Sequence, residues 1–502
     1  MAFKPLTKAE VLNALSFGKR VAEEEFAELG RYFVMTNQWQ QLLADEIDVF
    51  YGHKGTGKSA LYATLWQHRT ELQAKNILLV KGENIRGAPA FRALLETPSL
   101  NEGRFQHLWK LFFLQLIGST FREARFRSRK ARDLISRLED SGLLPREGGL
   151  GGLLRAALNY VTHFTRPEAV SGTIELDTAT SLPSGVTAKI SFKDPDLLNR
   201  DAEMASVDSL LMMAEEDLEA KNLNLWILLD RLDVAFHEYE EIEIAALRTL
   251  FRVYSDFLAF RRIGLKVFLR SDIWERITQE GFREASHITR ATTIQWSRNP
   301  FLNMVLRRVL QSDVVVSHFG VAQDETLASI RDQEVLFHRI IEPELSIGGE
   351  RANTFDWILR LTKDGTGRST PREVIHLLAE ARTIQIQKAA IGEDFPSGEA
   401  LISGSSVLEA LRSVSEFRLN QTLLSEYPVF RAVIGKLKGA PHHHSIDSLA
   451  ELWQFPESWV SPRAEELVEV GFFERRGTRE KPVYWIPFLY RPALDMRIDT
   501  AG

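Results

Sequence analysis

The chain of 502 residues contains no cysteine. This absence excludes disulfide bonds, thiolate metal sites and a thiol nucleophile, and it is typical of proteins from a reducing compartment. Positive charge is not in excess either, because 68 acidic residues outnumber 62 basic ones and the formal net charge is -6. This balance excludes a protein that binds nucleic acid through its bulk charge, although a local basic patch stays compatible with it.

Long hydrophobic runs are also missing from the sequence. The most apolar stretches, such as residues 111–117, are too short to cross a bilayer. The first residues, Met1 to Pro5, lack the apolar core of a signal peptide. We therefore expect a cytoplasmic protein that has no membrane partner.

One glycine-rich motif carries the strongest chemical signal. The run Gly52-His53-Lys54-Gly55-Thr56-Gly57-Lys58-Ser59 fits the pattern G-x-x-x-x-G-K-[ST]. Its glycines let backbone N–H groups point at phosphate oxygens, its lysine reaches the β- and γ-phosphates, and its serine hydroxyl binds Mg²⁺. A β-prone run at 47–51 precedes the motif and a helical pattern at 59–66 follows it. This order predicts a phosphate-binding P-loop rather than a surface turn.

Further apolar segments predict the remaining strands of a sheet. They lie at 77–80, 225–229, 265–269 and 293–296, and helical patterns separate most of them. Strands that alternate with helices form a parallel sheet covered by helices on both faces. Ligands bind such sheets at the carboxyl ends of the strands, so we expect the chemistry at that edge.

Two aspartates follow the strand at 225–229. Asp230 ends an apolar strand, where a carboxylate is costly unless it meets a cation or hydrogen-bond donors. A Mg²⁺ ion shared with Ser59 would satisfy this carboxylate, so both residues are predicted metal ligands. Asp233 either positions the attacking water or caps the segment that follows.

The segment Thr370-Pro371-Arg372-Glu373 predicts the start of a helix. Thr370 and Glu373 have the spacing of a capping box, and Pro371 stands where proline is tolerated. Arg372 would then lie in the first turn, where a cation opposes the helix dipole. Such a position is expected if an anion also binds there. The alternative is an exposed arginine that pairs with a nearby carboxylate.

The order of these motifs resembles the AAA+ and STAND types of P-loop ATPase. It is most similar to a poorly characterised bacterial family known simply as P-loop ATPase. The resemblance spans about residues 15–385 and rests on three matches: Phe17-Gly18 with Ala22 to Glu25, Lys54 to Ala60, and Leu269 to Ile273.

The resemblance implies roles for four further positions. Ser271 or Arg270 would be the sensor 1 residue, and Arg372 would be sensor 2, which contacts the γ-phosphate and moves the lid. Arg290 would be an arginine finger that reaches a neighbouring subunit, unless it forms an ordinary surface ion pair. The segment from Leu225 to Asp230 corresponds to the Walker B strand of this family. Family members usually carry a glutamate directly after the Walker B aspartate, whereas this chain has Arg231 after Asp230. Either Asp233 substitutes for that glutamate, or hydrolysis is slow and the protein acts as a switch.

The C-terminal pattern resembles a winged helix, with a helix at 462–470 followed by a hairpin. The helix carries three glutamates, which oppose a polyanion, whereas the hairpin tip carries four basic residues: Arg475, Arg476, Arg479 and Lys481. A second basic stretch, at 122–132, is either a solvated helix face or a contact for phosphates or a partner. We therefore favour a protein-docking or autoregulatory role for the C-terminal region, with nucleic-acid contact as the minority alternative.

Four parts follow from these patterns. They are an N-terminal helical segment (1–45), a P-loop core (46–300) with a helical and hairpin insertion at about 84–205, a helical lid (301–400) and a winged-helix-like domain (401–502). The predicted function is a Mg²⁺-dependent ATPase that works as a nucleotide-driven switch or assembly, either a homo-oligomer or with a partner protein. The resemblance links it to bacterial anti-phage defence. The alternatives are a non-hydrolysing nucleotide-gated scaffold or DNA-associated regulator, and, less favoured, a small-molecule kinase.

Overall fold

The chain consists of two units, which are described separately. The sheet unit spans Met35–Ile294, and the helical unit combines Met1–Val34 with Gln295–Gly502. The computed structural model describes residues 6–19, 25, 29–83, 102–145, 149–164, 190–191, 205–232, 240–279 and 281–496. The limits of the four parts predicted from the sequence are not tested by this division and remain predictions.

A five-stranded parallel sheet forms the centre of the sheet unit, as the sequence predicted. The strands lie in the order β2-β5-β6-β1-β7, so β6 separates the P-loop strand β1 from β5. Most residues of β1, β5 and β6 are buried, because helices cover both faces. The strands are β1 (Val49–Gly52), β2 (Ile77–Lys81), β5 (Asn224–Leu229), β6 (Ile263–Arg270) and β7 (Ala291–Thr293).

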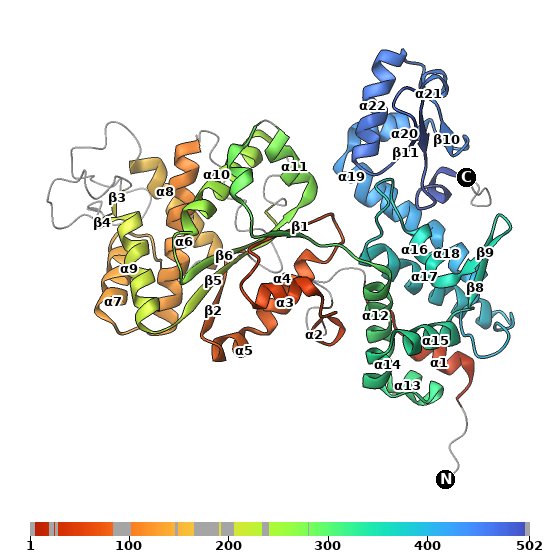
Figure 1. Cartoon of the computed structure of the whole chain (residues 1–502), viewed down its shortest axis with the longest axis horizontal. Helices are drawn as coiled ribbons and strands as arrows, with labels where there is room; N and C mark the ends of the chain where they lie inside the picture. Colours follow the sequence, from red (N-terminus) through yellow and green to blue (C-terminus); the bar gives the residue numbers. More distant parts are fainter. Residues whose placement is uncertain are drawn as a thin grey trace, which may run out of the picture. The chain divides into compact units, whose positions relative to one another are not determined.

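Helices flank this sheet on its two faces. Figure 1 shows α3 and α4 on one side of the strands and α6, α10 and α11 on the other. Successive side chains of a strand point to opposite faces of the sheet, as β6 illustrates. Phe268 packs against Phe50 and Tyr62 on one face. Val267 and Leu269 belong to the hydrophobic core that includes residues of α6 and α10. The helices are α3 (Asn37–Leu43), α4 (Lys58–Gln67), α5 (Arg69–Ala74), α6 (Glu102–Glu123), α7 (Arg129–Asp140), α8 (Gly149–Phe164), α9 (Val207–Ala220), α10 (Glu240–Phe257) and α11 (Ser271–Gln279).

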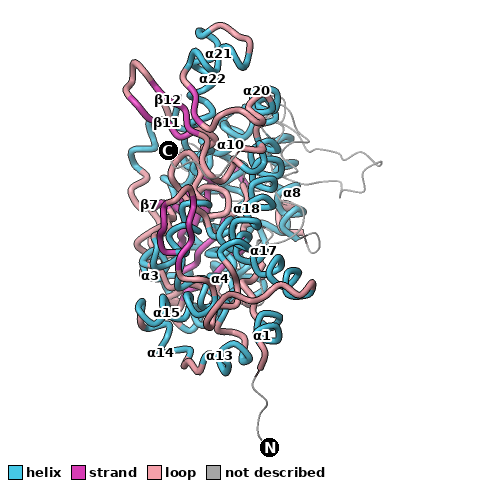
Figure 2. The backbone as a smooth tube through the Cα atoms, turned by 90° about the vertical axis from the view of Figure 1, so that its right-hand side faces the viewer, coloured by secondary structure: helices cyan, strands magenta, loops and turns pink. Residues whose placement is uncertain are grey.

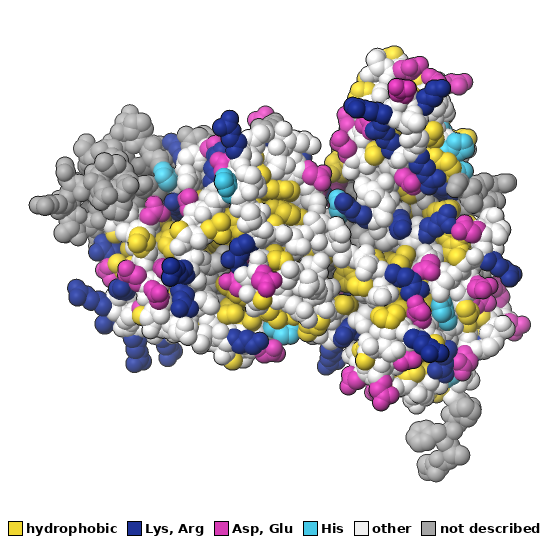
Figure 3. Space-filling model, viewed as in Figure 1, with side chains coloured by type: hydrophobic (Ala, Val, Ile, Leu, Met, Phe, Trp, Pro, Cys, Tyr) yellow, Lys and Arg dark blue, Asp and Glu magenta, His cyan; other side chains and the backbone are white. Residues whose placement is uncertain are grey.

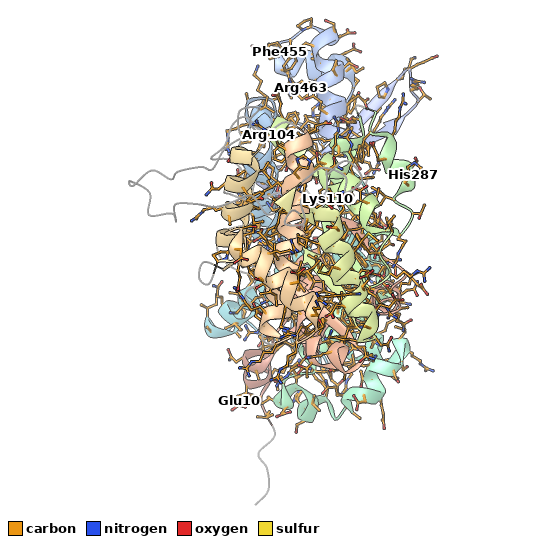
Figure 4. The ribbon with its side chains drawn as sticks, turned by 90° about the vertical axis from the view of Figure 1, so that its left-hand side faces the viewer. Glu10, Arg104, Lys110, His287, Phe455 and Arg463 are labelled. Atoms are coloured by element: carbon orange, nitrogen blue, oxygen red, sulfur yellow. The ribbon has the colours of Figure 1, made fainter. Side chains whose placement is uncertain are left out.

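The predicted insertion between β2 and β5 is helical where it is described. Its long helix α6 is fastened to α10, because the Trp109 indole N–H donates to the Ala246 carbonyl at 2.8 Å. Lys110, labelled in Figure 4, forms ion pairs of 3.0 Å with Asp208 and 3.1 Å with Asp256. Most of the predicted hairpin lies outside the described residues. Besides its helices, the described part of the insertion has the short strand β3 (Ile190–Ser191), which pairs in parallel with β4 (Ala205–Ser206).

The helical unit has one continuous hydrophobic core. Buried residues from Val11 to Met496 belong to it, so the segments predicted as lid and C-terminal domain share a core. Its helices are α1 (Lys8–Ala14), α2 (Leu29–Tyr32), α12 (Arg298–Val309), α13 (Asp313–Phe319), α14 (Gln323–Ala328), α15 (Ile330–Ile340), α16 (Thr354–Leu361), α17 (Pro371–Ala390), α18 (Gly404–Phe417), α19 (Leu424–Glu426), α20 (Arg431–Gly435), α21 (Ile446–Trp453) and α22 (Glu457–Glu469). Strands β8 (Glu344–Ile347) and β9 (Glu350–Asn353) form a hairpin.

The C-terminal region is winged-helix-like, as predicted. Figure 2 shows its hairpin of β11 (Glu474–Gly477) and β12 (Pro482–Trp485), to which β10 (His443–His444) adds a third strand. One boundary was wrong: α22 begins at Glu457, so Pro462 lies inside the helix rather than at its start. Among the helices that the structure describes, none combines the length and apolarity needed to cross a bilayer.

A buried cation stabilises the amino edge of the central sheet. The Lys266 side chain on β6 is fully buried, and its ammonium contacts Asp45 at 2.5 Å and Asp48 at 2.7 Å. Asp48 also accepts a 3.0 Å hydrogen bond from the Tyr254 hydroxyl and pairs with Arg290 at 2.9 Å. Because an uncompensated buried charge is costly, the sheet depends on Asp48 to neutralise Lys266.

We predict that Asp48→Asn lowers the free energy of unfolding of the sheet unit by about 3–5 kcal/mol, because it removes the buried partner of Lys266. Urea denaturation followed by circular dichroism measures the change. Asp208→Asn is the control, since Asp208 is 59% exposed and its pair with Lys110 contributes about 1 kcal/mol or less. Equal losses in the two variants would contradict the prediction.

Candidate functional site

The glycine-rich motif forms a tight loop between β1 and α4. Gly57 has φ of +99°, a left-handed conformation that glycine adopts without steric cost, and it is the residue that precedes α4. The Lys58 ammonium donates hydrogen bonds to the carbonyls of Gly52 at 2.7 Å and His53 at 3.0 Å. The predicted strand, loop and helix are therefore present, with the lysine folded across the loop and the helix N-terminus directed at it.

The order of the strands brings two predicted residues, Ser271 and Asp230, to the edge where this loop lies. β6 runs between β1 and β5, with Gly52 as register partner of Arg270 and Leu229 as partner of Val267. Since all three strands are parallel, the P-loop, Ser271 and Asp230 follow their carboxyl ends at the same edge. This is the edge at which such sheets bind ligands.

Asp230 is only 4% exposed at the end of β5. Burial first and the Asp230 charge second raise the pKa of Tyr62, a residue of α4, above its usual range. The residue after Asp230, Arg231, has φ of +57°, a left-handed backbone conformation that is uncommon for a residue other than glycine. Asp233 lies outside the described residues.

Of the two sensor 1 candidates, Ser271 has the environment expected of a ligand-binding residue. Its side-chain oxygen is buried and has no hydrogen-bond partner among the described residues, and the residue is 8% exposed. Arg270 instead binds Asp272 through two hydrogen bonds, of 3.0 and 2.8 Å. Burial raises the pKa of Asp272, but the charge and hydrogen bond of Arg270, together with the Arg276 charge, hold that pKa below its usual range.

This arrangement fits a nucleoside triphosphate that is bound together with Mg²⁺. A buried hydroxyl without a partner costs free energy unless a ligand supplies one, and Ser271 stands at the correct edge for such a ligand. Position 52 belongs to the same cradle, because a Cβ there would lie 2.4 Å from the Thr56 hydroxyl oxygen. Ser59 in the first turn of α4 and Asp230 supply the hard oxygen ligands that Mg²⁺ prefers. Lys54, Gly55 and Ala60 complete the predicted loop.

Arg372 begins the long helix α17 of the helical unit. Thr370 is the residue before the helix and Pro371 is its first residue, as predicted. The reciprocal capping box is absent, because the Thr370 hydroxyl donates to the Glu373 carboxylate instead of accepting from the backbone. The Arg372 Nε is buried without a hydrogen-bond partner, and no described carboxylate pairs with this side chain. The predicted alternative, a paired surface arginine, is therefore not what the described residues show.

Arg290 lies at the opposite edge of the sheet from the P-loop. It directly precedes β7, whose Ala291 is the register partner of Val49 at the start of β1. Its guanidinium pairs with Asp48 at 2.9 Å and Asp45 at 3.1 Å within the same chain. These contacts match the ordinary ion pair that the sequence left open beside the arginine finger.

Sequence reasoning missed a second carboxylate at the edge of the sheet where the candidate site lies. Glu83 follows β2 by two residues and its side chain is fully buried. It contributes, after burial and Asp230, to the raised pKa of Tyr62, whose hydroxyl donates to the Glu83 carbonyl at 2.9 Å. The rule that identified Asp230, an acid directly after an apolar strand, would have identified Glu83 if applied to residues 77–83.

The basic segments differ in how their charges are compensated. At the C-terminal hairpin, Arg475 pairs with Glu465 at 3.3 Å and Arg476 with Glu474 at 2.8 Å. Figure 3 shows acidic and basic side chains interspersed on this part of the molecule rather than gathered by sign. In the other stretch Lys130 pairs with Glu216, whereas four exposed arginines form no ion pair with any described residue: Arg125, Arg127, Arg129 and Arg132.

Comparisons with known proteins give structural likeness only. No protein-family model matches the sequence, and no curated protein is a significant relative. Among solved structures, the chain is similar to the Aeropyrum pernix ORC2 protein in its ADPNP–ADP complexes, with 13% identity and a TM-score of 0.41 over 97% of this chain and 96% of that one. The ADP form of the same protein has 13% sequence identity and a TM-score of 0.32, over 96% of this chain and 93% of that one. The Aeropyrum pernix ORC1 protein in complex with DNA has 12% sequence identity and a TM-score of 0.34, over 98% of this chain and 97% of that one.

We predict that Ser271→Ala leaves the melting temperature of the nucleotide-free protein unchanged or slightly higher, because it removes a buried hydroxyl without a partner. The same variant should bind Mg·ATP about three- to tenfold more weakly, the loss expected for one hydrogen bond. Thermal unfolding with and without Mg·ATP measures both effects. Ser128→Ala is the control, since it removes the cap of α7 and lowers stability without changing the nucleotide-induced shift. An equal shift in wild type and Ser271→Ala would contradict the prediction.

Proposed function

We propose that this protein is a magnesium-dependent P-loop ATPase whose nucleotide state drives a conformational switch or an assembly. The observation that supports the proposal is the convergence of the P-loop, Ser271 and Asp230 at one edge of a parallel sheet. Catalysis of phosphoryl transfer depends almost entirely on positioning and on neutralising charge, and these residues supply both.

Each predicted residue then has a defined task. The loop amides and Lys58 hold the β- and γ-phosphates, while Ser59 and Asp230 hold the metal. Bound Mg²⁺ would neutralise charge on the phosphates. Ser271 would donate its hydroxyl hydrogen to a phosphate oxygen, and Arg372 would recognise the γ-phosphate and transmit its loss to α17.

Arg290 receives a structural task in this proposal. Its two ion pairs within the chain support a role in stabilising the amino edge of the sheet, and they do not favour an arginine finger. A homo-oligomer or a partner protein stays part of the proposal, without a residue assigned to the interface. A role in anti-phage defence has only the sequence resemblance in its favour.

The second candidate function is a nucleotide-gated scaffold or DNA-associated regulator that binds ATP without hydrolysing it. One observation favours it: the sequence has Arg231 where the ATPases it resembles carry a glutamate, and an arginine cannot act as a base. Tight ATP binding without turnover at any protein concentration would select this candidate.

We predict that Lys58→Ala and Asp230→Ala each reduce ATP turnover at least about a hundredfold, because each removes a group that stabilises phosphate or metal charge. Phosphate release under saturating Mg·ATP measures the rate. Lys58→Ala should also weaken ATP binding, since its ammonium contacts the phosphates in the ground state. Wild-type turnover in Lys58→Ala would rule out this site as the source of the activity.

We predict that Arg372→Ala reduces the preference for ATP over ADP about tenfold, the loss expected when a charged hydrogen bond to the γ-phosphate disappears. Competition binding of the two nucleotides measures the ratio of their affinities. Arg382→Ala provides the control on the same helix, because Arg382 donates to the carbonyls of Leu12 and Asn13 and has no predicted nucleotide contact. An unchanged ratio in Arg372→Ala would remove the sensor 2 assignment.

A further inference from the structure

Glu83 leaves β2 beside the strand that ends in Asp230. Lys81 is the register partner of Leu228, and the Gly82 N–H donates a 2.8 Å hydrogen bond to the Leu228 carbonyl. Continuing this parallel register places Glu83 next to Asp230. The two residues are 0% and 4% exposed. Two buried carboxylates therefore follow neighbouring strands at the functional edge.

Glycine at position 82 allows this close approach. A Cβ on Gly82 would lie 2.4 Å from the Leu229 side chain and 3.0 Å from the Leu228 carbonyl oxygen. A larger residue would require the Leu229 side chain or the adjoining backbone to shift. The backbone that carries Glu83 is thus held against the end of the strand that carries Asp230.

Tyr62 links the backbone that carries Glu83 to the P-loop helix. It lies one turn after Lys58 in α4, and its hydroxyl donates to the Glu83 carbonyl at 2.9 Å. The charges of Asp230 and Glu83 both act on its phenol, in addition to burial. The first turns of α4, the end of β5 and the end of β2 therefore meet in one region of the sheet unit.

The two residues follow adjacent strands at one edge of the sheet, so their carboxylates can take different tasks there. Asp230 already has the metal as its proposed partner. Arg231 cannot act as a base, because a guanidinium has no lone pair to accept a proton. Glu83 supplies a carboxylate at the same edge, from the neighbouring strand rather than from the strand of Asp230.

Building on the ATPase activity proposed above, we infer that Glu83 is the general base of ATP hydrolysis. Its carboxylate orients a water molecule and accepts a proton from it as the water oxygen forms a bond to the γ-phosphorus. The bond between the γ-phosphorus and the bridging oxygen breaks, and its electron pair leaves with ADP. The carboxylate then returns its proton to solvent, so inorganic phosphate and ADP are the products.

Glu83→Gln tests this assignment, because it keeps the shape of the side chain and removes the basic oxygen. Turnover should fall at least about a hundredfold, within the range that general bases contribute. The affinity for Mg·ATP should stay within about threefold of wild type by calorimetry. Nucleotide recovered from the quenched complex should be ATP in the variant and largely ADP in the wild type.

Asp217→Asn is the matched control for loss of a buried carboxylate. Asp217 is 3% exposed, pairs with Lys221 at 2.5 Å, and lies near the end of α9, which leads into the amino end of β5. Its replacement should reduce stability and leave turnover per folded molecule unchanged. Glu83→Asp is a second variant, which keeps the carboxylate on a side chain that is shorter by one methylene group. This variant should also bind ATP and hydrolyse it slowly.

Turnover of Glu83→Gln within threefold of wild type would overturn the assignment, and so would loss of ATP binding in both Glu83 variants, which would indicate a structural role. If the wild-type protein binds ATP but never hydrolyses it, both the proposed ATPase activity and the assignment of Glu83 as general base are wrong. Nucleotide binding through Lys58 is measured separately, so the failure of the P-loop site and the failure of Glu83 give different results.

Discussion

Parallel pairing of β2, β5, β6 and β1 is the constraint from which the functional site follows. Because these strands run in one direction, everything that follows their carboxyl ends meets at a single edge. The P-loop, Ser271, Asp230 and Glu83 each follow one of the four strands. The Ser271 hydroxyl at that edge is buried without a hydrogen-bond partner among the described residues, which costs free energy that a bound triphosphate would offset.

The opposite edge of the same sheet serves stability. There Lys266 is buried and neutralised by Asp45 and Asp48, and Arg290 joins the same cluster from the start of β7. The charges at this edge are satisfied by one another within the chain. This contrast between the edges supports the structural task proposed for Arg290, whose place in the sequence resembles that of an arginine finger.

The sequence was most informative where a residue's role depends on its neighbours along the chain. The P-loop between β1 and α4, Asp230 after an apolar strand and Pro371 at the start of α17 could all be predicted from local patterns. It was least informative where a role depends on the order of strands in space. The pairing of Arg290 with Asp48, and the place of Glu83 beside Asp230, follow from β7 lying next to β1 and β2 next to β5.

The central claim is that the P-loop edge binds a triphosphate together with magnesium. Calorimetric titration of the whole chain with ATP, in the presence of magnesium and then with the metal chelated, tests it most directly. The account predicts one nucleotide per chain and an affinity that weakens clearly when magnesium is removed. Absence of heat with ATP and with ADP in magnesium-containing buffer would contradict it.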